Sequence, residues 1–145
     1  MNEKKFRKFK NFKINNLSIG KKIVFTKKLT EKFLSDSLVY LEDNHPVHLD
    51  KSWAKNLGYN KKIFPGFSLI GVFSNLIGTK LPGINSVIMD VQFSFKHPAY
   101  VGDKLLFSCT VKKVFKNFNV VKLNLEVKNE KKKIIMGEVK CKILK

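Results

Sequence analysis

The hydrophobic positions along this chain change their period near residue 85. In the second half, apolar residues alternate with polar ones through four segments, at residues 87–95, 105–111, 121–127 and 135–143. Such alternation is typical of strands that have one apolar face each. Turn residues and short connections separate the four segments, which predicts that the strands pair in an antiparallel manner.

The first half combines one short strand with helical spacing. Residues 19–26 read as a strand, and Thr30 then offers an N-cap for a helix that carries apolar residues every three or four positions up to Leu41. Asp50 is a second N-cap candidate, and Gly58 is a suitable residue to end the short helix that follows it.

A third helix is expected to begin after Pro65-Gly66. Residues 67–78 are apolar on nearly every side, which is typical of a helix buried in a core, and Leu81-Pro82-Gly83 should end it. The predicted fold class is therefore α+β, with an antiparallel sheet of five or more strands wrapped around a long buried central helix.

Composition narrows the class of protein. The chain has 145 residues and a net charge of +18, but arginine occurs only once, at Arg7. The lysines are spread along the whole chain, and proteins that read bases or clamp phosphates usually rely on arginine forks, so we favour solvated surface lysines over a nucleic-acid footprint. A positive rim would still attract an anionic substrate, such as a phosphate-bearing coenzyme or an acidic carrier protein.

Residues 1–17 form a basic N-terminal arm with interleaved phenylalanines, and residues 18–145 are expected to form a single domain. The arm could lie on a membrane surface, although packing against the domain is the simpler expectation. No run reaches the roughly 20 apolar residues of a membrane span, and no secretory signal is visible, so we expect a cytoplasmic protein without membrane insertion. Cys109 and Cys141 fall on apolar positions and should be buried, reduced thiols.

The segment around Pro46 carries the candidate chemistry. Asp43 precedes His48 by five residues, and Pro46 between them favours an irregular, bent loop on which both side chains can converge. A carboxylate and an imidazole held together can remove and deliver protons, which makes an enzyme the leading hypothesis. An ordinary turn is one alternative. Another is a metal site of Asp43, His45 and His48, but their spacing matches no common zinc pattern, so we expect no metal.

Several motifs in register resemble one family. They are Asp43-Asn-His-Pro-Val-His48-Leu-Asp50, Phe64-Pro-Gly66-Phe67, Leu81-Pro-Gly83, Phe95-Lys-His-Pro98 and Val101-Gly-Asp103. Together they look like the MaoC-like dehydratases and (R)-specific enoyl-CoA hydratases of the hot-dog fold, over roughly residues 19–144. The resemblance implies reversible hydration of a trans-2-enoyl thioester, carried by coenzyme A or an acyl carrier protein, to the (R)-3-hydroxyacyl thioester. It implies no other cofactor, and it implies a homodimer or a multiple of one that completes the acyl tunnel between subunits.

The resemblance also implies residue roles. Asp43 and His48 match the catalytic dyad that holds a water against the double bond. Gly66 matches the glycine whose backbone N–H binds the thioester carbonyl, which suits the positive end of a helix. Phe67 is expected to line the substrate tunnel. Ser74 matches a serine found near the site in some members, and a small residue on a crowded helix face is the alternative reading.

Three positions depart from the family pattern. Glu42 stands where a glycine usually precedes the catalytic Asp, His45 stands where an asparagine commonly precedes the proline, and Pro65 stands where a histidine usually precedes the oxyanion glycine.

Three other functions remain open. They are a hot-dog thioesterase, a non-catalytic subunit that binds acyl thioesters, and a basic binder of nucleic acid or membrane surfaces that uses the arm.

Overall fold

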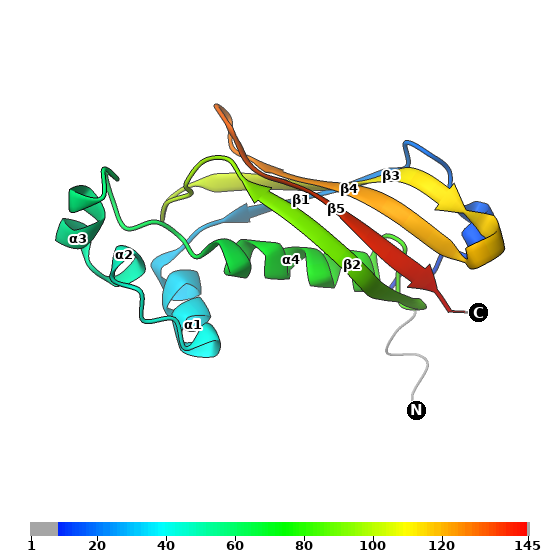
Figure 1. Cartoon of the computed structure of the whole chain (residues 1–145), viewed down its shortest axis with the longest axis horizontal. Coiled ribbons are helices and arrows are strands. Elements are labelled where there is room, and N and C mark those ends of the chain that lie inside the picture. Colours follow the sequence, from blue (N-terminus) through cyan, green and yellow to red (C-terminus); the bar gives the residue numbers. More distant parts are fainter. Residues whose placement is uncertain (1–8, 145) are drawn as a thin grey trace.

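The computed structural model of the chain describes residues 9–144, and it consists of one sheet, four helices and short connecting turns (Figure 1). The elements in chain order are β1 (Lys22–Lys28), α1 (Glu31–Leu41), α2 (Pro46–Leu49), α3 (Lys51–Asn56), α4 (Gly66–Thr79), β2 (Ser86–Phe95), β3 (Lys104–Phe115), β4 (Val120–Lys128) and β5 (Lys133–Ile143). Two 3₁₀ turns, η2 (Ile14–Asn16) and η3 (Lys116–Phe118), precede β1 and β4.

The sheet has five antiparallel strands in the order β1-β3-β4-β5-β2, which confirms the predicted antiparallel sheet. β2 and β3 are consecutive in the chain but are not neighbours in the sheet, since β2 pairs with β5 at one edge and β3 pairs with β1 near the other. The connection at residues 96–103 therefore passes across the end of β4 and β5. This crossing brings Lys96, His97, Pro98 and Ala99 to the rim of the candidate site.

α4 lies along one face of the curved sheet, and its inner side supplies the centre of the core (Figure 1). Its buried residues are Leu69, Phe73, Leu76 and Ile77. The Phe73 ring meets Phe107 edge-on at 5.5 Å and stacks on Phe93 at 6.1 Å, so aromatic contacts join the helix to two strands. The burial is one-sided, because Phe67, Gly71 and Ser74 on the outer side are exposed in the single chain.

β2 exposes most of its apolar residues in the single chain. Val87, Ile88, Met89 and Val91 are all exposed, and only Phe93 is partly buried against the core. A register irregularity between Ile88 and Asp90 interrupts the alternation. β2 lies at the edge of the sheet, where it pairs with β5.

The described part of the N-terminal arm, residues 9–17, contacts the end of α4. The Lys10 N–H donates to the Thr79 carbonyl at 2.9 Å, and Leu17 is buried in the core. Gly83 accommodates this contact, because its φ is +107° and a Cβ there would lie 2.1 Å from the Lys10 carbonyl oxygen. The alternative in which the arm lies on a membrane surface rests partly on residues 1–8, outside the described part.

Other local predictions agree with the structure. Thr30 accepts a hydrogen bond from the Phe33 N–H at the start of α1, and Asp50 accepts one from the Trp53 N–H at the start of α3. Cys109 and Cys141 are free and buried, and burial raises the pKa of each thiol to about 12. Within residues 9–144, no helix is both long enough and apolar enough to cross a membrane.

Candidate active site

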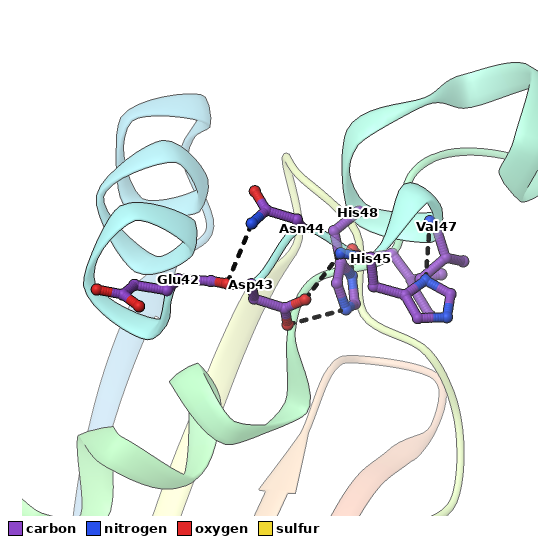
Figure 2. Close-up of polar contacts among 7 residues, drawn as sticks. Glu42, Asp43, Asn44, His45, Val47 and His48 are labelled. Atoms are coloured by element: carbon purple, nitrogen blue, oxygen red, sulfur yellow. Dashed lines mark hydrogen bonds and ion pairs between the residues drawn. The ribbon is translucent and has the colours of Figure 1, made fainter.

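Asp43 is placed by the end of α1. Glu42 ends that helix in the left-handed conformation, with φ 51° and ψ 33°, and turns the chain sharply. The Asp43 N–H then donates to the Leu38 carbonyl at 3.0 Å, which fixes the backbone directly after the turn. One carboxylate oxygen of Asp43, Oδ1, accepts a hydrogen bond from the His45 N–H at 3.0 Å, and this leaves Oδ2 directed toward His48 (Figure 2).

His48 lies on a helical turn, which corrects the prediction that an irregular loop carries both members of the pair. Pro46 begins α2 at its first position, where a proline ring fits and its missing N–H costs nothing. The His45 side chain caps the turn, since its Nδ1 accepts a hydrogen bond from the Val47 N–H at 3.1 Å. A nitrogen used in this way replaces the side-chain oxygen that an asparagine would supply as an N-cap.

The tautomer of His48 follows from one hydrogen bond. Its Nδ1 lies 2.8 Å from the carbonyl oxygen of Ile63, and because a carbonyl only accepts, Nδ1 carries the hydrogen. Nε2 of the neutral ring then carries a lone pair. Ile63 is itself held in place, because its N–H donates to the Val47 carbonyl at 3.3 Å and its backbone pairs with Tyr100.

His48 and Asp43 face each other across a short gap. Nε2 of His48 lies 3.6 Å from Oδ2 of Asp43, which is too long for a direct hydrogen bond but short enough for one water to contact both atoms. The side chain of His48 is 12% exposed and that of Asp43 is 30% exposed. The two acceptors are thus partly withdrawn from solvent but still accessible to a small molecule.

Gly66 is the first residue of α4, and Pro65 before it provides no side-chain cap. The first N–H groups of a helix have no partner within the helix, and they lie at the positive end of its dipole. Pro65 holds φ at −59°, so the chain enters the helix in a defined direction. Gly66 therefore presents an N–H group that suits a negatively charged oxygen.

A pocket of about 340 Å³ brings His48 and Gly66 together. Its wall is mostly apolar and includes Phe64, Phe67, Phe95 and Ile135. Asp43 does not line this pocket and instead borders a neighbouring hollow between α1 and α2. Asp43 and His48 therefore lie between this hollow and the pocket.

The structure brings four of the five predicted site residues to this region and leaves one apart. Asp43, His48, Gly66 and Phe67 are grouped there, although the Phe67 side chain is largely exposed. Ser74 is exposed on the outer side of α4, two turns from Gly66, and does not line the pocket.

The metal alternative has no support in the geometry. One nitrogen of His45 is occupied as the α2 cap, and no group of three or more His, Cys, Asp or Glu side chains in residues 9–144 is arranged to hold a metal ion.

Sequence reasoning missed two residues of the site. Ile63 orients His48 through its backbone carbonyl, and a backbone contact of this kind cannot be recognised from the residue type. Phe95 was named on the apolar face of a strand and in the motif Phe95-Lys-His-Pro98 but was given no role, yet its ring lies against Gly66. That motif, at the end of β2, was the signal from which a role at the site could have been inferred.

Comparison with known proteins gives three findings. The family described as "FAS1-like, dehydratase domain region" matches residues 24–137. The chain is 32% identical over 90 residues to the (R)-specific enoyl-CoA hydratase of Aeromonas caviae, covering 62% of this chain and 67% of that enzyme. It is 28% identical over 99 residues to a mitochondrial 3-hydroxyacyl-[acyl-carrier-protein] dehydratase of Solanum lycopersicum, covering 66% of this chain and 59% of that protein.

Among solved structures, the chain resembles the unliganded R-hydratase of Pseudomonas aeruginosa, with a TM-score of 0.84 and 26% identity over 93% of this chain and 87% of that one. The sequence matches therefore span about three fifths to two thirds of the curated relatives, while the structural match spans most of both chains.

Proposed function

Given that this chain belongs to the FAS1-like dehydratases, the MaoC-like family of the hot-dog fold, we propose that it catalyses the reversible hydration of a trans-2-enoyl thioester to the (R)-3-hydroxyacyl thioester. The observation that carries this proposal is the geometry of the dyad. Two acceptors 3.6 Å apart, Nε2 of His48 and Oδ2 of Asp43, leave room for one water beside a pocket that also contains Gly66.

The dyad would orient that water by accepting both of its hydrogens. Because Nδ1 of His48 donates to Ile63, Nε2 is free to accept one of them, and Oδ2 of Asp43 accepts the other. A lone pair of the water oxygen then points away from the dyad, toward the β-carbon of the enoyl group. As the new C–O bond forms, the dyad takes one proton from the water and delivers a proton to the α-carbon, so that the net reaction adds one water.

Gly66 would stabilise the charge that develops during this addition. Attack at the β-carbon moves electrons toward the thioester oxygen, giving it enolate character, and an N–H at the start of α4 can donate to that oxygen. The positive end of the helix dipole acts in the same direction. Binding the oxygen here also polarises the double bond before water attacks.

We further propose a homodimer as the working form. The exposed apolar side chains of the edge strand β2 and the exposed outer side of α4 support a partner subunit against this half of the molecule. The positive charge of the chain supports a substrate carried on coenzyme A or on an acidic acyl carrier protein. The absence of any further cofactor and a cytoplasmic location stay predictions.

Hydration of crotonyl-CoA by dyad variants tests the proposal. We expect His48→Gln and Asp43→Asn each to lower kcat by about 10²–10⁴-fold, which is the usual contribution of general acid–base catalysis. The reaction is followed by loss of the absorbance of the conjugated thioester. His97→Gln is a matched control, because His97 also lines the pocket and its Nδ1 also lies 2.8 Å from a backbone carbonyl, that of Lys133. Wild-type rates in both dyad variants would contradict the assignment.

A further inference from the structure

The ring of Phe95 fills the space beside Gly66. A Cβ added to Gly66 would lie 2.4 Å from Cε1 of Phe95 and 2.9 Å from its Cδ1, so the edge of the ring rests directly on the Gly66 backbone. Residue 66 can have no side chain while the ring is in this position. The ring therefore bounds the pocket beside the residue whose N–H is proposed to hold the thioester oxygen.

Phe95 is a wall of the pocket and not part of the core. It is the last residue of β2, where its backbone pairs with Ile135, but its side chain is 53% exposed. Its ring lies 6.4 Å from that of Phe67, which is 74% exposed. Since neither ring is enclosed by the core, their size affects the shape of the pocket more than the stability of the fold.

The position of the Phe95 ring beside Gly66 relates it to the α-carbon of a bound acyl thioester. When a thioester oxygen accepts a hydrogen bond from Gly66, the atoms nearest to this residue are the carbonyl carbon and its two neighbours, the sulfur and the α-carbon. The dyad acts on the α- and β-carbons, so the α-carbon must lie between Gly66 and His48. Since the Phe95 ring borders Gly66, a substituent on the α-carbon that extends to the Gly66 side would meet this ring.

We propose that Phe95 is a specificity-determining residue that excludes acyl groups branched at the α-carbon. This inference rests on the proposed function, since it needs a thioester bound at Gly66. The discrimination expected from one misplaced methyl group in an apolar pocket is about 10–200-fold. Replacing Phe95 by a small residue should remove most of it, because the methyl group then has room.

Two pairs of isomeric thioesters test the inference. Butyryl-CoA and isobutyryl-CoA have the same atoms but differ in whether the α-carbon is branched, and neither contains a double bond to hydrate. Their dissociation constants are measured by titration calorimetry for wild type, Phe95→Ala and Phe95→Leu. Phe118→Ala is the control, because Phe118 is also an exposed aromatic but lies in the turn between β3 and β4.

We expect wild type and Phe118→Ala to bind butyryl-CoA at least about 10-fold more tightly than its branched isomer. Phe95→Ala should bring the ratio close to one, and Phe95→Leu should give an intermediate value. For turnover, the ratio of kcat/KM for methacrylyl-CoA to that for crotonyl-CoA should rise in the same order.

Other results would overturn the role of Phe95 or the proposed function itself. An unchanged ratio in both Phe95 variants, or equal binding of the two isomers by wild type, would overturn the role of Phe95 while leaving the hydratase proposal in place. A wild-type protein that binds neither isomer and hydrates no crotonyl-CoA would overturn the proposed function, and this inference with it.

Discussion

Glu42 shows how a single residue before the dyad carries backbone strain. Its φ of 51° lies in the left-handed region, which costs a residue with a side chain about 1–2 kcal/mol. The turn cannot be relaxed without moving Asp43, the next residue, whose N–H donates a hydrogen bond to the Leu38 carbonyl. The glycine that the family resemblance implies at this position is therefore explained by conformation, and Glu42 keeps the same turn at a cost in stability.

Replacing Glu42 by glycine should stabilise the protein. We expect Glu42→Gly to raise the free energy of unfolding by about 0.5–1 kcal/mol, because the strain is removed and is only partly offset by the entropy of glycine. Denaturant unfolding measures the change. Glu31→Gly, at the other end of α1 in ordinary helical conformation, is the control and should lower stability. A loss of stability in Glu42→Gly would show that the turn is not strained.

At the level of elements, the short helix α2 decides where the imidazole lies. The sequence predicted the caps of α1 and α3 because Thr30 and Asp50 are typical N-cap residues. It failed at α2 because Pro46 was taken to prevent a helix, whereas a proline at the first position begins one. A histidine is also an unusual cap, so nothing in the sequence marked His45 as the residue that closes this turn.

The capping role of His45 predicts a difference between two substitutions. His45→Asn should retain the cap, and His45→Ala should lose about 1 kcal/mol in the free energy of unfolding. Because α2 carries His48, kcat for crotonyl-CoA should also fall further in His45→Ala than in His45→Asn. Equal effects of the two substitutions on stability and kcat would exclude the capping role.

For the whole molecule, the two edges of the sheet differ in chemistry. β1 carries Lys22, Lys27 and Lys28, which discourage another strand from pairing there. β2 instead has a run from Val87 to Val91 in which Asp90 is the only charged residue. The difference favours β2 as the edge that meets a second copy of the chain.

One lysine on each edge tests this difference. We expect Val91→Lys to shift the protein from dimer to monomer and to lower hydratase activity, because the charge must be buried in the interface. Val24→Lys, on the exposed part of β1, should leave the dimer intact. Light scattering during size-exclusion chromatography reports the mass. A monomeric wild type, or a Val91→Lys variant that remains dimeric, would contradict the proposed interface.

The sequence predicted most of the strands and helices, but it did not predict the order of the strands in the sheet or which residues of different elements are in contact. Alternating segments predicted the strands, and a continuous apolar run predicted α4. Strand order depends on which strands pair in three dimensions. Local patterns did not reveal that β2 pairs with β5, the last strand in the chain, at the edge of the sheet. For the same reason Asp43, His48 and Gly66 could be named, whereas the contact between Phe95 and Gly66 could not.

The most direct test of the central claim is the identity of the product that wild-type protein forms from crotonyl-CoA. The account predicts (R)-3-hydroxybutyryl-CoA, identified by mass and chiral chromatography, with the thioester bond intact. Release of free coenzyme A and crotonate would indicate a thioesterase, and unchanged crotonyl-CoA at high protein concentration would indicate that this substrate is only bound or not recognised. Either of these results would contradict hydration of this enoyl thioester by Asp43 and His48.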